Sequence, residues 1–125
     1  MTRFALASVL VLGACSSDDS HELGTVQMGG YTMKISREGD APVAGAMTDF
    51  VVKPESGGMP TSVKGWIGTS TRMDSAIVDG VYDPDDGDYD HDITVPSPLA
   101  TDAMWVFEVD TNGTDATASI AFQGD

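Results

Sequence analysis

Five aspartates crowd into the segment from residue 83 to residue 90, and carboxylate oxygens are the ligands that calcium prefers. Pro84 and Gly87 within this segment favour a tight turn, which would bring the acidic side chains on either side of it together. The sequence therefore predicts a calcium site. The alternative is a solvated turn, because the segment lacks the glycine and the distal glutamate of an EF-hand loop. The predicted calcium ligands are Asp83, Asp85, Asp86 and Asp88.

Thioether sulfurs and one imidazole offer a second kind of metal chemistry, because both suit copper. The candidate copper ligands are Met59, Met73, His91 and Met104. A copper site requires these side chains to converge at one end of the fold. The alternative is that the methionines fill gaps in the core and that His91 lies at the rim of a strand face.

Motifs for catalysis are missing from the chain. The sequence contains no Gly-x-Ser-x-Gly, no His-Glu-x-x-His and no phosphate-binding glycine loop. We therefore expect a protein that is not an enzyme, with no catalytic residues and no firmly implied cofactor beyond copper or calcium.

Strands are the elements expected to position these residues. Fourteen glycines and six prolines interrupt the chain, and no window between them carries the apolar stripe of a helix. Alternating segments instead predict strands over 31–36, 46–53, 61–69, 76–82, 88–95, 103–110 and 114–123. The predicted fold class is all-β, an immunoglobulin-like antiparallel β-sandwich of about seven strands.

Local patterns predict hairpins and the two sides of several strands. In the segment 88–95, Tyr89, His91 and Ile93 share one side, so the aspartates between them are expected to face water. Asn112-Gly113 between two alternating segments is a strong hairpin signal. The expected core positions include Tyr31, Met33, Ile35, Phe50, Val52, Trp105, Phe107 and Val109.

The balance of charge restricts the partners. The chain carries 20 acidic and 6 basic residues, a formal net charge of −14 at pH 7. Such a charge argues against nucleic acid and against anionic lipid surfaces as partners. It permits binding of cations or basic peptides, so we expect a protein partner whose identity the sequence does not give.

The N-terminal 14 residues have the build of a secretory signal. Arg3 supplies the positive charge, and residues 4–12 form an apolar run of about nine residues, whereas a membrane span needs about 20. Leu12-Gly13-Ala14-Cys15 follows directly and resembles the lipobox of bacterial lipoproteins. The alternative is a secreted protein with a chance cysteine near its cleavage site.

The lipobox resemblance implies lipid attachment to Cys15 and anchoring to a membrane of the cell envelope through palmitate-type acyl chains. Ser16 after the cysteine implies the outer membrane if the organism is Gram-negative. The expected organisation is a signal peptide over 1–14, a flexible tether over 15–29, where Ser, Asp, Gly and Gln dominate, and a sandwich domain over 30–125.

Several short segments together resemble the YtkA-like or FixH-like domains of bacteria. These segments are Gly30-Tyr31, 42–46, Met59-Pro60, 79–82 and Trp105. The resemblance implies an immunoglobulin-type sandwich and an association with copper handling or oxidase assembly, although Thr61 and Ser62 follow Met59-Pro60 where the family carries a histidine. The overall expectation is a lipid-anchored, non-catalytic binding or accessory module of the cell envelope, with copper handling or calcium binding as alternatives.

Overall fold

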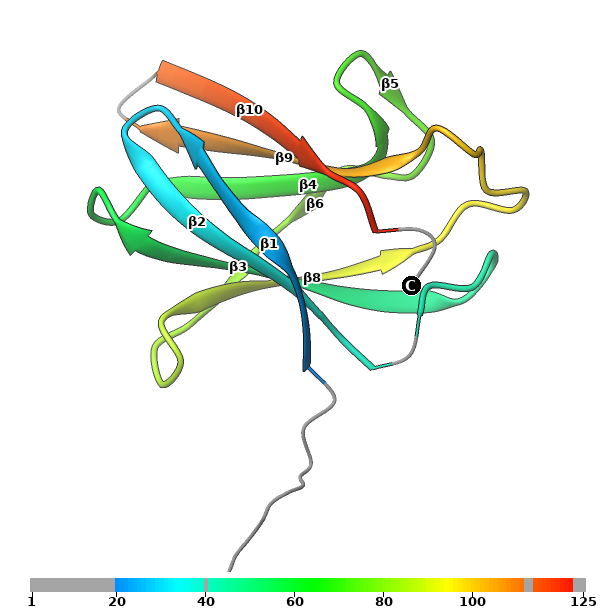
Figure 1. The fold of residues 1–125 in the computed structure, drawn as a ribbon, viewed down its shortest axis with the longest axis horizontal. Helices are drawn as coiled ribbons and strands as arrows, with labels where there is room; N and C mark the ends of the chain where they lie inside the picture. Colours follow the sequence, from blue (N-terminus) through cyan, green and yellow to red (C-terminus); the bar gives the residue numbers. More distant parts are fainter. Residues whose placement is uncertain (1–19, 40, 112–113, 123–125) are drawn as a thin grey trace, which may run out of the picture.

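The computed structural model describes residues 20–39, 41–111 and 114–122. Within these ranges the chain forms ten strands and no helix. The strands make two antiparallel sheets that enclose one apolar core between them (Figure 1). The prediction of an all-β antiparallel sandwich is confirmed.

The first sheet has the strand order β1-β2-β3-β8-β7. Two of its inner strands, β3 and β8, pair with Asp49 opposite Asp92. Its strands are β1 (Ser20–Met28), β2 (Tyr31–Glu38), β3 (Met47–Ser56), β8 (Asp88–Thr94) and β7 (Val81–Asp83). Three of the candidate ligands, Asp83, Asp88 and His91, lie on β7 and β8.

The second sheet has the order β10-β9-β4-β5, and β6 also pairs with β4. Figure 1 places β9 and β10 in the upper part of the view and β3 and β8 in the lower part, with β1 and β2 crossing in front. The strands of this sheet are β4 (Ser62–Thr69), β5 (Arg72–Met73), β6 (Val78–Asp79), β9 (Met104–Thr111) and β10 (Thr114–Ile120).

The domain begins earlier than the sequence predicted. The segment from Ser20 to Met28, expected to be part of a flexible tether, is strand β1 and pairs along β2. Gly29 and Gly30 both have positive φ and form the two-residue turn that joins these strands. A register shift between Glu22 and Gly24 interrupts the alternation of this strand, so its pattern is hard to detect in the sequence. Residues 15–19 lie outside the described ranges.

The predicted strand over 76–82 is two strands in two different sheets. β6 pairs with β4, and β7 pairs with β8. The chain crosses from one sheet to the other at Gly80, where an added Cβ would lie 2.6 Å from Nε2 of His91. The sequence predicted about seven strands, whereas the described residues form ten. The difference comes from the division of 76–82 into two strands and from the unpredicted strands β1 and β5.

The core is built from the inward sides of both sheets, at the positions predicted. Phe50 of β3 stacks on Trp105 of β9 with ring centroids 4.4 Å apart, and Phe122 meets Phe50 edge-on at 5.3 Å. Val63 and Ile67 of β4 also join this core, whereas Trp66 is buried outside it. Burial of the large aromatic rings supplies much of the apolar area that stabilises the sandwich.

Candidate functional site

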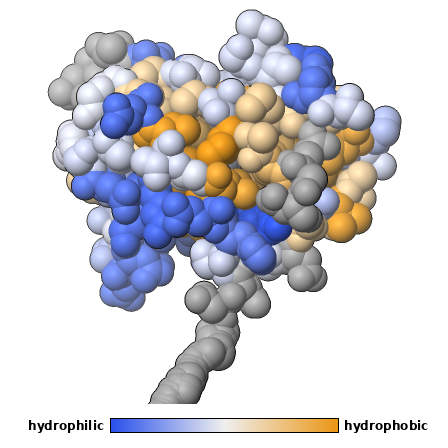
Figure 2. All heavy atoms as spheres, in the orientation of Figure 1, coloured by the Kyte–Doolittle hydropathy of each residue, from blue (hydrophilic) through white to orange (hydrophobic). Residues whose placement is uncertain are grey.

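Acidic side chains gather on the outer side of the first sheet. Along β8, Tyr89, His91 and Ile93 are buried, and the alternating aspartates project to the opposite side, as predicted. Figure 2 shows hydrophilic residues across the lower left of the molecule, where Figure 1 places the β7–β8 turn. We call this outer side the acidic face, and it comprises Glu38, Asp49, Asp83, Asp88, Asp90 and Asp92.

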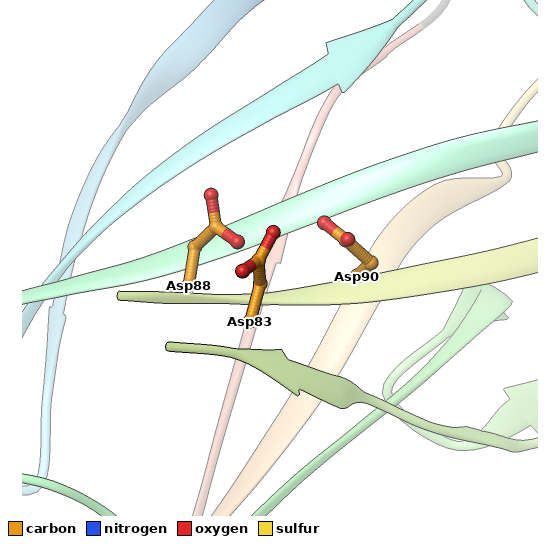
Figure 3. Close-up of side chains that lie close together, drawn as sticks. All are labelled: Asp83, Asp88 and Asp90. Carbon is orange, nitrogen blue, oxygen red and sulfur yellow. The ribbon is translucent and has the colours of Figure 1, made fainter. Parts of the chain in front are cut away.

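Three aspartates of the acidic face form a compact cluster. One carboxylate oxygen from each of Asp83, Asp88 and Asp90 lies within 4.8 Å of the others. Asp83 extends from β7, and the other two extend from β8 to the same side (Figure 3). Because hard cations such as calcium take several carboxylate oxygens, this is the arrangement in the described residues that best suits such a cation.

The structure therefore brings together only part of the predicted calcium set. Asp83 and Asp88 lie directly opposite each other across the strand pair. Asp85 and Asp86 are exposed in the turn, where the backbone N–H of Asp85 donates to Oδ1 of Asp83 at 3.0 Å. Asp90 is one of the five aspartates that the sequence singled out, but it was not among the four predicted ligands. The period of two along β8 adds it, because residues 88 and 90 must share a side.

Burial and mutual repulsion raise the pKa values of two aspartates in this cluster, Asp88 and Asp90. Burial, followed by repulsion from Asp90, Asp86 and Asp83, raises the pKa of Asp88 to about 6. Burial and neighbouring aspartates also raise the pKa of Asp90. Oδ1 of Asp88 is buried and has no hydrogen-bond partner in the part of the chain that the structure describes. A bound cation would therefore relieve an electrostatic cost that the fold carries.

A second group of carboxylates crosses the same face as a row. Glu38 of β2 lies opposite Asp49 of β3, and Asp49 lies opposite Asp92 of β8. Side chains directly opposite on neighbouring strands have Cβ atoms about 4.5–5.5 Å apart, and like charges there repel. Burial, followed by the charges of Asp90, Asp92 and Glu38, raises the pKa of Asp49 to about 7. The sequence did not predict this row, because the pairing of three strands decides it.

The candidate copper ligands do not converge. His91 has no exposed surface, and its Nε2 lies 3.0 Å from the carbonyl oxygen of Val63 across the core. Its ring also packs edge-on against Trp105, 5.2 Å between centroids. His91 is therefore an interior histidine, and burial lowers its pKa. The prediction of a rim position is wrong because His91 lies in the middle of a strand beneath the crossing at Gly80.

The three methionines lie near two different ends of β4. Gly68 near one end of β4 pairs with Met73 of β5 on one side and with Met104 of β9 on the other. Met59 precedes the other end of β4, which begins at Ser62. Six strand positions separate these ends, which corresponds to about 20 Å. Met59 and Met73 are about half exposed, and Met104 projects to the side opposite Trp105. These residues do not form a common site with His91.

The proposed anchor, Cys15, lies outside the described ranges. Within those ranges, no helix has the length and hydropathy that crossing a membrane would need.

No protein-family model, curated protein or solved structure matches the chain. The acidic face, with its cluster and its row, is accordingly the feature from which a function can be inferred.

Proposed function

We propose that this protein is a non-catalytic binding or accessory module of the cell envelope that docks a basic protein partner on its acidic face. The row formed by Glu38, Asp49 and Asp92 carries this proposal. Ionised carboxylates directly opposite one another destabilise a sheet. A cationic surface placed on them would convert that repulsion into attraction.

The charges within the described residues do not already neutralise this row. The ion pairs found there join Lys34 to Glu22, and Arg72 to Asp74 and Asp102. None of them reaches Glu38, Asp49 or Asp92. The acidic face is therefore available for electrostatic recognition, which raises association rates and selects basic partners.

The proposal includes a lipid anchor at Cys15, on the strength of the lipobox-like residues that end at this cysteine. Two or three acyl chains would hold the domain at a membrane, the outer membrane in a Gram-negative cell. Labelling of the full chain with a palmitate analogue in a bacterial host tests this part. Incorporation into the wild type and its loss in Cys15→Ser is the expected result, and an unlabelled wild type would contradict it.

We also propose an immunoglobulin-like topology and a YtkA-like or FixH-like affiliation. The two-sheet antiparallel architecture supports both, together with the short segments from Gly30-Tyr31 to Trp105 that resemble this family. The separation of Met59, Met73, Met104 and His91 argues for a binding role in preference to copper handling.

Titration of the isotope-labelled full chain with a ten-residue lysine peptide tests the docking proposal by NMR. We expect salt-sensitive shift changes at the amides of β3 and β8. Two variants separate the acidic face from net charge alone. Glu38→Gln/Asp49→Asn/Asp92→Asn should weaken binding clearly more than the matched control Asp79→Asn/Glu108→Gln/Asp115→Asn, which removes as many charges from the second sheet. Equal losses in the two variants would contradict the proposal.

Calcium binding is the second candidate function, favoured by the carboxylate oxygens of Asp83, Asp88 and Asp90, which lie within 4.8 Å of one another. Three carboxylates without other ligands suggest weak binding, on the order of 10⁻³ M. Calorimetry of the full chain with Ca²⁺ at fixed ionic strength is expected to give one site, which Asp88→Asn removes and Asp86→Asn retains. Heat that is equal for Ca²⁺ and Mg²⁺ and insensitive to Asp88→Asn would exclude a specific site.

A further inference from the structure

A depression of about 400 Å³ opens beside the carboxylate row. The connection between β2 and β3 forms one side of it, and the start of β3 forms its floor. One part of its lining is acidic, with Glu38, Asp49 and Asp92. The other part is apolar and includes Val43 and Met47. The depression is therefore amphipathic, because both acidic and apolar side chains line it.

The apolar part is unusual because its large side chains face water. Val43 is 62% exposed and Met47 is 65% exposed. Met47 is held in place from one side, since the hydroxyl of Thr94 donates to its sulfur at 3.4 Å. Exposed apolar side chains beside a depression are typical of a surface that a ligand covers.

One acceptor that lines the depression is unsatisfied. Oδ1 of Asp49 is buried and has no hydrogen-bond partner within the described residues. The hydroxyl of Thr48 is also buried without a partner there, but Thr48 lies opposite Ile93, so its side chain projects to the core side of the sheet and does not contribute to the depression's acidic lining. Buried polar atoms normally have partners, so Oδ1 of Asp49 points to a donor that the described part of the chain does not supply.

We infer that this depression binds an arginine side chain of the partner polypeptide, with the guanidinium among Glu38, Asp49 and Asp92 and the aliphatic stem against Val43 and Met47. The inference rests on the proposed docking of a basic partner and names its specific contact. A guanidinium presents five donors in a planar fork that matches carboxylates. Its three methylene groups are suited to lie along apolar surface while the charged head reaches polar atoms.

The test uses the isotope-labelled full chain at pH 8 and a blocked peptide, Gly-Gly-Arg-Gly-Gly. A second peptide with citrulline in place of arginine keeps the shape and removes the charge. We expect the arginine peptide to shift the amides of Gly39, Thr48 and Asp49, and the citrulline peptide to bind at least about tenfold more weakly, the loss expected when a charged hydrogen bond is removed.

Variants of the protein locate the contact. Asp49→Asn should weaken binding of the arginine peptide about tenfold, whereas Asp86→Asn, which removes an equal charge from the turn at the other end of the acidic face, should change it less than twofold. Val43→Ser keeps every charge and should weaken binding by about threefold, because part of the apolar wall is lost.

The outcomes separate the two proposals. Asp86→Asn and Asp49→Asn could weaken binding of the arginine peptide equally, with amide shift changes spread over β8. That result would show that the depression is not the contact, but it would leave the proposed docking on the acidic face intact. If citrulline binds as well as arginine, charge recognition in the depression is overturned. If neither this peptide nor the lysine peptide binds, both proposals fail together.

Discussion

Nε2 of His91 lies 3.0 Å from the carbonyl oxygen of Val63, so the hydrogen bond joins a strand of one sheet to a strand of the other through the core. The backbone N–H of Gly80 donates to the same oxygen at 2.8 Å. A carbonyl oxygen only accepts, so Nε2 must carry the proton. Nδ1 is then the acceptor, and it has no hydrogen-bond partner in the described part of the chain.

This geometry predicts that His91 opposes folding in acid. Burial keeps its pKa in the folded state below 6.5, so only the unfolded state takes up a proton as the pH falls through that value. The contribution of this residue to the free energy of unfolding should fall by about 1.4 kcal/mol per pH unit below 6.5, until the folded state also becomes protonated.

Urea unfolding at pH 8, 6.5 and 5.5 measures this effect as a difference between the wild type and His91→Phe. As the pH falls, the free energy of unfolding of the variant should rise relative to that of the wild type, because phenylalanine binds no proton in the unfolded state. His21→Gln, a change at the exposed histidine of β1, is the control for loss of a histidine. A constant difference between wild type and His91→Phe would show that His91 is not kept neutral by burial.

The carboxylate of Asp49 is predicted to lower the free energy of unfolding at high pH. Its pKa in the folded state is raised to about 7, so above pH 7 the folded protein holds a repelled carboxylate, and between pH 7 and 4 it takes up a proton that the unfolded state does not. The destabilisation of the folded state by Asp49 is therefore largest above pH 7 and decreases as the pH falls.

Asp49→Asn should accordingly raise the free energy of unfolding at pH 8 by about 1 kcal/mol after allowance for solvent screening, and by less at pH 5. A shift of this size corresponds to about 4–8 °C in the thermal midpoint of a small domain. Calorimetry at the two pH values measures it, with Asp86→Asn as the exposed control. A variant less stable than the wild type at pH 8 would contradict the proposed repulsion.

Gly65 of β4 is predicted to admit no side chain. A Cβ at this position would lie 1.8 Å from Cη2 of Trp105, inside the core. Gly65→Ala should therefore destabilise the fold by about 3 kcal/mol or more and disturb the near-ultraviolet circular dichroism of tryptophan. Gly58→Ala is the control, since its added Cβ meets open space and only the positive φ should cost about 1 kcal/mol. Equal effects of the two changes would contradict the close packing on Trp105.

Strand β1 is predicted to be part of the folding unit. Met28 is 7% exposed, Leu23 and Val26 pack against the core, and an added Cβ at Gly24 would lie 2.9 Å from Cδ1 of Ile120 in β10. A chain that begins at residue 30 should lose about 3 kcal/mol or more relative to one that begins at residue 20, because these side chains leave the core. Denaturant unfolding of the two chains measures the difference. Equal stabilities would restore the interpretation of this segment as a tether.

Much of the sandwich was predictable from local patterns. The alternation along residues 88–95 correctly assigned Tyr89, His91 and Ile93 to the inside, because the period of two is a property of a single strand. The turn between β7 and β8 was equally predictable, since Gly87 and its neighbours favour it wherever they lie; the N–H of Gly87 donates to the carbonyl oxygen of Asp83 at 2.7 Å. The Asn112-Gly113 turn lies outside the described residues, but β9 and β10 pair on either side of it, with Thr111 opposite Thr114.

The sequence by itself therefore determined the fold class, the hairpin and the sides of the strands, whereas only the tertiary structure decided which charges meet. The row of Glu38, Asp49 and Asp92 draws on three strands, and β8 lies far from the other two in the chain. The register between such strands is a long-range property that no local pattern encodes. Long-range strand pairing also decides that the four candidate copper ligands lie apart and that His91 lies in the core. Local spacing predicts the side of a strand on which a residue lies, but packing of the two sheets decides what lies beside it.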